Sequence, residues 1–125
     1  MQVQVLKSKI HRARVTQSDL EYEGSLGVDL DLMEEVGILP YEKLLVVNAN
    51  NGARLETYAI PAPRESRTFC LNGAAARLGE IGDVITLMVF GVMPADEAVD
   101  FVPRIVVLDE NNEIEARRGA FEQNA

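Results

Sequence analysis

The sequence predicts a mainly β protein, a small closed barrel with one or two short helices. Many short runs of strand-forming residues are separated by Gly and Asn turns, and only one longer stretch has helical spacing. Aromatic residues make up 6% of the chain and Trp is absent, so the core must consist of Val, Leu, Ile and Ala. With 125 residues and no linker or repeat, the chain fits a single domain, residues 1–125.

Seven runs show the strand pattern. They are Gln2–Leu6, Ala13–Thr16, Lys43–Ala49, Ala53–Ile60, Thr68–Asn72, Asp83–Val92 and Arg104–Leu108. Asn51-Gly52 lies between two of them and predicts a hairpin. Asp109–Asn112 is typical of a further turn, and we expect the polar tail from Glu113 onward to be poorly ordered at its end.

One helix is predicted over Asp29–Val36. Its apolar residues share one face, acidic residues lie near its start, and Gly37 stands where a C-terminal cap belongs. A shorter helical turn is expected at Ala74–Leu78. The acidic residues of the longer helix are interpreted as a solvated face, because the glycine of a calcium loop is missing.

The composition excludes several classes of function. A net charge of -8 disfavours nucleic acid and anionic membranes as partners. The start of the chain has no signal-peptide pattern and no apolar run reaches the length of a membrane span. Cys70 is the only cysteine, which favours a reducing cytoplasm, and it is interpreted as a small buried apolar residue. His11 is the only histidine, so His clusters that bind metal are excluded and no metal is expected.

Gly24-Ser25 can undergo a reaction that involves its own peptide bond. A serine hydroxyl can attack the preceding carbonyl carbon and move the acyl group from nitrogen to oxygen, and glycine there leaves the carbonyl unobstructed. Elimination of the resulting ester gives dehydroalanine, which hydrolyses to a pyruvoyl group. By itself, however, a Gly-Ser pair is nearly always a turn or a loop.

Four segments together resemble the pyruvoyl-dependent aspartate 1-decarboxylases, in order and at that family's spacing, from about Lys7 to Arg104. These segments are Lys7-Ser8-Lys9-Ile10-His11-Arg12, Tyr22-Glu23-Gly24-Ser25, Asn51-Gly52-Ala53-Arg54 with Thr57-Tyr58-Ala59-Ile60, and Asn72-Gly73-Ala74-Ala75-Ala76.

The resemblance implies a double-psi β-barrel, a cytoplasmic homo-tetramer with sites between subunits, and autocatalytic cleavage into residues 1–24 and 25–125. It implies decarboxylation of L-aspartate to β-alanine and CO2, which supplies β-alanine for pantothenate and coenzyme A biosynthesis. The cofactor is then the covalent pyruvoyl group, with no pyridoxal phosphate and no metal. Cleavage is either spontaneous or assisted by a maturation factor.

The resemblance also implies a role for each matching residue. Ser25 becomes the pyruvoyl group, which forms a Schiff base with the substrate, and Tyr58 donates a proton to the decarboxylated carbon. Gly24, Ser25 and Thr57 take part in self-processing. Lys9 and Arg54 hold substrate carboxylates.

The other implied site residues fall into two groups. Asn72, Gly73, Ala74 and Ala75 join Thr57 as further substrate contacts, and His11 and Tyr22 are supporting groups. The sequence departs from the family's usual pattern at Leu26-Gly27 and at Arg77, which are interpreted as affecting only the rate of processing.

Other interpretations of the sequence stay open. Arg54 and Tyr58 lie four apart on a predicted strand and share one face, with Thr57 on the other, so without the resemblance they are ordinary surface residues. One alternative is a non-enzymatic barrel that acts as a binding or assembly module. Another is a pyruvoyl decarboxylase for a different amino acid, such as glutamate, which is one methylene longer than aspartate.

Overall fold

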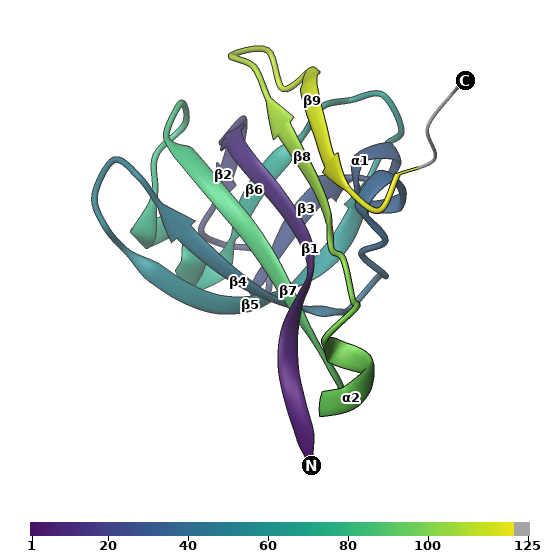
Figure 1. Cartoon of the computed structure of the whole chain (residues 1–125). Helices are drawn as coiled ribbons and strands as arrows, with labels where there is room; N and C mark the ends of the chain where they lie inside the picture. The colour runs from purple at the N-terminus through teal and green to yellow at the C-terminus, as the bar shows by residue number, and fades with distance from the viewer. Residues whose placement is uncertain (122–125) are drawn as a thin grey trace.

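The computed structural model describes residues 1–121 and confirms a mainly β fold with few short helices (Figure 1). This architecture is consistent with a small β-barrel. The elements are β1 (Gln2–Arg14), β2 (Gln17–Asp19), β3 (Ser25–Asp29), α1 (Leu30–Val36), β4 (Lys43–Asn48), β5 (Arg54–Ala62), β6 (Phe69–Asn72), the 3-10 helix η1 (Gly73–Leu78), β7 (Val84–Pro94), α2 (Ala95–Ala98), β8 (Arg104–Leu108) and β9 (Ile114–Gly119).

The strands form one hydrogen-bonded sheet in the order β2-β6-β3-β5-β4-β7-β1-β8-β9. Parallel pairs join β1 to β8, β2 to β6 and β3 to β5, and the other neighbours are antiparallel. Thr16, just after β1, donates its backbone N–H to the Phe69 carbonyl of β6 at 2.9 Å. Its hydroxyl accepts from the Phe69 N–H at 2.9 Å. The sheet therefore curls until the end of β1 meets β6.

The core inside this curled sheet is aliphatic, as the composition predicts. Phe69 is the only aromatic residue among its largest fully buried side chains, and the others come from several strands and from α1. They are Ile10, Leu26, Leu32, Met33, Leu44, Leu71, Ile85, Leu87, Leu108, Val15 and Val28.

Two local predictions are confirmed. The β4–β5 hairpin turns through Gly52, whose φ of 76° is the left-handed conformation that glycine adopts easily. Helix α1 begins after Asp29, whose carboxylate accepts the Asp31 N–H at 2.8 Å, and ends at Gly37 with a φ of 79°. The expected turn at Ala74–Leu78 is present as η1.

The prediction of two separate strands before residue 17 is wrong. Strand β1 is continuous over 13 residues, because β7 and β8 supply hydrogen-bonding partners on its two edges. Its register with β7 shifts between Leu6 and Ser8 and between Ile10 and Ala13, and Arg12 has a φ of 66°. These irregularities interrupt the alternation of side chains that identifies a strand in a sequence.

Three short strands and one helix were not predicted: β2, β3, β9 and α2. All five residues of β3 are buried, so it lacks the alternation of a strand with one exposed face. Strand β9 shows that the tail is ordered at least through Gly119. The expectation of disorder at its very end concerns residues 122–125, which lie outside the described part of the chain.

Candidate active site

Ser25 is the first residue of β3, and its side chain is almost completely buried. The residue is 1% exposed and lies opposite Asn72 in the antiparallel β3–β6 pair. The Asn72 Nδ2 group donates a hydrogen bond of 2.9 Å to Ser25 Oγ. Two residues that the sequence predicts to share a site are therefore in direct contact.

Cys70 extends this contact by one step. Its thiol donates to Asn72 Oδ1 across 3.2 Å, so both ends of the Asn72 amide are engaged. Burial, and to a smaller degree the nearby Asp19 carboxylate, raises the pKa of the Cys70 thiol. The interpretation of Cys70 as a buried apolar residue is thus wrong in part, since the residue is half-buried and makes a polar contact.

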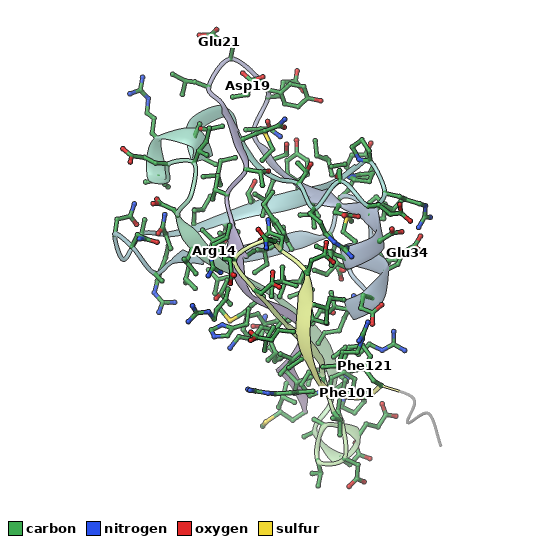
Figure 2. All side chains as sticks on the ribbon, turned by 90° about the horizontal axis from the view of Figure 1, so that it is seen from above. Arg14, Asp19, Glu21, Glu34, Phe101 and Phe121 are labelled. Atoms are coloured by element: carbon green, nitrogen blue, oxygen red, sulfur yellow. The ribbon has the colours of Figure 1, made fainter. Side chains whose placement is uncertain are left out.

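The backbone at Gly73 packs directly against the segment that precedes Ser25. Gly73 has a φ of 64°, and a Cβ at this position would lie 2.8 Å from the Tyr22 carbonyl oxygen and 2.9 Å from Gly24 Cα. Gly24 itself has open space where its Cβ would be. Figure 2 shows Asp19, the last residue of β2, and Glu21, in the loop between β2 and β3, at the outer edge of the molecule. The Gly24–Ser25 bond therefore joins this exposed loop to a buried strand.

A surface hollow of about 250 Å³ adjoins Gly24. Thr57, Ala74 and Ala75 line it, and all three are predicted site residues. Leu55, Glu56 and Leu78 also line it and were not identified from the sequence. Leu55 lies two residues before Thr57 on β5, so the period of a strand could have identified it.

Tyr58 occupies the position on β5 next to Ser25. Leu26 pairs with Ala59 at the start of the parallel β3–β5 ladder, and Ser25 and Tyr58 are the residues that precede this pair on the two strands. The Tyr58 side chain is exposed at the surface, where its ring lies 6.4 Å from that of Tyr41. Among residues 1–121, no hydrogen bond joins Tyr58 to Ser25.

Arg54 also lies on β5, three residues before Thr57. Arg54 and Tyr58 are exposed while Thr57 is half-buried, which agrees with the expected alternation of faces. Within the described residues, Arg54 and Lys9 form no ion pair with a carboxylate. Both cations therefore remain available to an anionic ligand.

Lys9 and His11 lie on β1, away from this group in the sheet. Strands β5, β4 and β7 come between β3 and β1 in the hydrogen-bonded order. His11 Nδ1 is 3.1 Å from Thr86 Oγ1 on β7, and burial together with the charges of Lys9 and two arginines lowers its pKa. Among residues 1–121, neither residue hydrogen-bonds to Ser25 or Asn72. The Tyr22 carbonyl oxygen lies beside Gly73, but the Tyr22 side chain is exposed.

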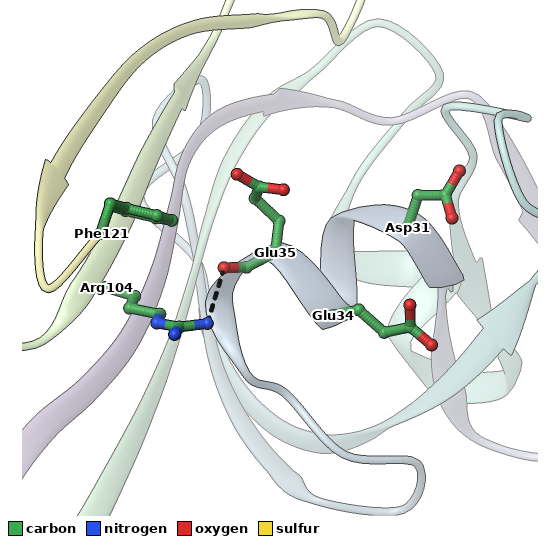
Figure 3. Close-up of a pocket in the computed structure, with 5 residues that line it drawn as sticks. All are labelled: Asp31, Glu34, Glu35, Arg104 and Phe121. Atoms are coloured by element: carbon green, nitrogen blue, oxygen red, sulfur yellow. Dashed lines mark hydrogen bonds between the residues drawn. The ribbon is translucent and has the colours of Figure 1, made fainter. Parts of the chain in front are cut away.

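A second hollow, of about 360 Å³, lies beside α1 (Figure 3). Asp31, Glu34, Glu35, Arg104 and Phe121 line it, so carboxylates outnumber the single cation. Asp31 and Glu34 accept hydrogen bonds from Arg64 at 2.7 and 2.8 Å. Arg117 pairs with Glu35, so arginines from outside the hollow neutralise its carboxylates. The hollow contains none of the predicted site residues.

Residues 1–121 contain neither a metal-binding cluster nor a membrane-spanning helix. No three His, Cys, Asp or Glu side chains in this part gather closely enough to hold a metal ion. None of its helices combines the length and apolar character that crossing a membrane requires.

Comparison with known proteins gives a consistent result. The model of the family described as aspartate decarboxylase matches residues 1–115. The chain is 52% identical to an aspartate 1-decarboxylase of Maricaulis maris, over 94% of this chain and 97% of that protein. It is 55% identical to an aspartate 1-decarboxylase of Staphylococcus epidermidis, over 87% of this chain and 85% of that protein. The matched region contains Ser25 and every residue placed around it, and the chain belongs to the aspartate decarboxylase family.

Proposed function

We propose that this protein decarboxylates L-aspartate to β-alanine and CO2, using a pyruvoyl group that it makes from Ser25 by cutting its own chain after Gly24. The observation that carries the proposal is the buried Ser25 hydroxyl, held by Asn72 next to a glycine whose carbonyl is unobstructed by a side chain. Membership of the aspartate decarboxylase family supports the substrate and the reaction. A supply of β-alanine for pantothenate synthesis follows from the same proposal.

Self-cleavage begins with the Ser25 hydroxyl. Its oxygen bonds to the Gly24 carbonyl carbon, the C–N bond breaks, and the hydroxyl proton passes to the freed amine. Loss of the Ser25 α-proton then expels the Gly24 carboxylate and leaves dehydroalanine, and water converts this to a pyruvoyl group and ammonia. Thr57 assists this step through its hydroxyl, and its position in the lining of the hollow beside Gly24 supports that role.

The residues around position 25 suit the binding of aspartate. A pyruvoyl group supplies a ketone that condenses with the substrate amine and accepts the electrons left when the α-carboxylate departs. The Arg54 guanidinium and the Lys9 ammonium hold carboxylate oxygens. The Tyr58 hydroxyl returns a proton to the α-carbon, and the backbone of Gly73, Ala74 and Ala75 lines the substrate.

The position of Lys9 and His11 on β1 supports a site shared between copies of the chain. In a homo-tetramer these residues reach Ser25 from a neighbouring subunit. Phe90 and Val92 are exposed apolar residues on β7, next to β1, and such surfaces commonly mediate association. The tetramer is part of the proposal.

Denaturing mass spectrometry tests the proposal. We expect the purified protein to give one piece of residues 1–24 and one of residues 25–125, the latter with a blocked N-terminus that borohydride reduces. The Ser25→Ala variant should give a single uncut chain without activity. An uncut wild-type chain, or two pieces from Ser25→Ala, would contradict the mechanism.

Substrate choice is measured separately, as CO2 release from L-aspartate, L-glutamate and L-alanine. We expect aspartate to be preferred, because a cation prepared for the second carboxylate stays unpaired when alanine binds. Faster turnover of glutamate would favour the alternative of a decarboxylase for a longer diacid. Absence of CO2 from all three would favour a non-enzymatic barrel.

A further inference from the structure

We propose that Cys70 is a positioning residue for self-cleavage, which acts by fixing the orientation of the Asn72 amide against Ser25. This inference rests on the proposed function, because it concerns the rate at which the Gly24–Ser25 bond is cut. Cys70 touches neither Gly24 nor the Ser25 hydroxyl in this role. It acts through Asn72.

The three side chains form a hydrogen-bonded chain across β6 and β3. The Cys70 thiol donates to Asn72 Oδ1 at 3.2 Å, and Asn72 Nδ2 donates to Ser25 Oγ at 2.9 Å. Cys70 and Asn72 are two residues apart on β6, so their side chains leave the strand on the same side. The Asn72–Ser25 bond is buried, where water cannot replace either partner.

The orientation of the Asn72 amide decides what the Ser25 hydroxyl can do. With the amide nitrogen toward Ser25, the hydroxyl oxygen accepts a hydrogen bond and keeps its own proton free for transfer during the attack on Gly24. With the amide rotated by half a turn, the Asn72 oxygen would instead hold the hydroxyl proton. A donor at Cys70 favours the first orientation, because it satisfies the amide oxygen on the side away from Ser25.

Gly27 makes room for this arrangement. It pairs with Cys70 across the β3–β6 ladder. A Cβ at Gly27 would lie 3.3 Å from Cys70 Cβ and 3.9 Å from Asn72 Nδ2. The glycine thus lets Cys70 and Asn72 pack closely against β3, which gives a structural reason for one of the two departures noted in the sequence.

The thiol is a dependable donor at neutral pH. Its pKa is raised by burial and by the Asp19 carboxylate, so the protonated form is favoured. A deprotonated sulfur beside the Asn72 oxygen would lose the hydrogen bond.

The experiment compares Cys70→Ser with Cys70→Ala. Both variants remove the volume of the sulfur, but only serine keeps a donor, so the difference between them isolates the hydrogen bond. Freshly translated chains are followed over time on denaturing gels as residues 1–24 separate from 25–125. Thr16→Val is the matched control, because it removes a side-chain hydrogen bond to Phe69, next to Cys70 on β6, and leaves the Cys70–Asn72–Ser25 chain intact.

We expect Cys70→Ala to cleave about three- to tenfold more slowly than wild type, the effect of losing one hydrogen bond, and Cys70→Ser to restore most of the rate. Thr16→Val should cleave at the wild-type rate even if its melting temperature falls. Equal rates for Cys70→Ala and Cys70→Ser overturn the positioning role, as does equal slowing by Thr16→Val. An uncut wild-type chain overturns the proposed function itself, which separates the two failures.

Discussion

The Ser25 hydroxyl differs from that of Ser8, the other buried serine of the described residues, in the direction of its hydrogen bond. Ser8 Oγ donates to the Val36 carbonyl at 2.6 Å, so its proton is fully engaged. Ser25 Oγ accepts from Asn72 instead and keeps its proton available. The two serines are about equally buried, and they differ in whether the hydroxyl proton is engaged.

Asn72→Ala should therefore slow self-cleavage by about three- to tenfold, because the hydrogen bond that orients Ser25 is lost. The measurement is the rate at which residues 1–24 are released from newly made protein. Ser8→Ala is the control, since it leaves the Val36 carbonyl without its donor and should cost about 1–3 kcal/mol of unfolding free energy. Slower cleavage in the control would show that stability, and not orientation, sets the rate.

Arg54→Ala should separate substrate binding from processing. We expect kcat/KM for aspartate to fall by about 100-fold, as the loss of a charge-assisted hydrogen bond predicts, while cleavage after Gly24 continues. Lys43→Ala is the control, because Lys43 is an exposed cation whose ion pair with Glu56 is on the surface. Unchanged turnover in Arg54→Ala would remove this residue from the site.

At the scale of elements, η1 and β3 together form the proposed cleavage site, because the first residue of η1 packs against the loop that leads into β3. Gly73 must be glycine for two reasons: its φ is positive, and an added Cβ would lie only 2.9 Å from Gly24 Cα. Gly52 has a positive φ as well, 76°, but nothing lies within 4 Å of its missing Cβ. The two glycines share a positive φ and differ in what an added Cβ would meet.

Gly52→Ala should lose about 1 kcal/mol of stability from backbone strain, and Gly73→Ala should lose more, because its added methyl group also meets backbone atoms of Tyr22 and Gly24. Only Gly73→Ala should also slow self-cleavage, because its added methyl group displaces the Tyr22–Gly24 segment. Thermal unfolding gives the first quantity and denaturing gels the second. Normal cleavage in a folded Gly73→Ala protein would show that the close packing is unimportant for the reaction.

Elements with a local signal could be predicted from the sequence. The β4–β5 hairpin has its Asn-Gly turn, and α1 has an acidic start, an apolar face and Gly37. Strand β3 has no such signal, since its five residues are buried by β5 and β6, which come later in the chain. The middle of β1 was missed for a similar reason, because its register shifts disrupt the alternation.

The candidate site was predictable only in part. Its motifs identified Ser25, Asn72 and the backbone of Gly73, which the structure brings together. The role of Cys70 was not visible, because a single cysteine in an apolar strand carries no information about the direction of its thiol. The separation of Lys9 from Ser25 depends on the order of the strands in the sheet, which the sequence does not state.

At the scale of the whole molecule, the proposed site draws residues from more than one copy of the chain. Lys9→Ala and Tyr58→Phe should each abolish decarboxylation. The first removes a cation that holds a substrate carboxylate, and the second removes the proton donor. If the two residues of a site come from different subunits, co-expression of the variants restores an intact pair in about a quarter of the sites of mixed tetramers. Activity that stays at the level of the single variants would place both residues on the same chain.

The position of β1 in the interior of the sheet has a consequence for the fate of a cut protein. This strand is bonded along both edges, by β7 and β8, and β2 is bonded to β6, so every strand before residue 25 is anchored in the remainder of the molecule. A severed N-terminal piece would thus stay hydrogen-bonded within the sheet after the chain is cut. The two fragments should migrate together in native gel filtration and part only when the protein is unfolded.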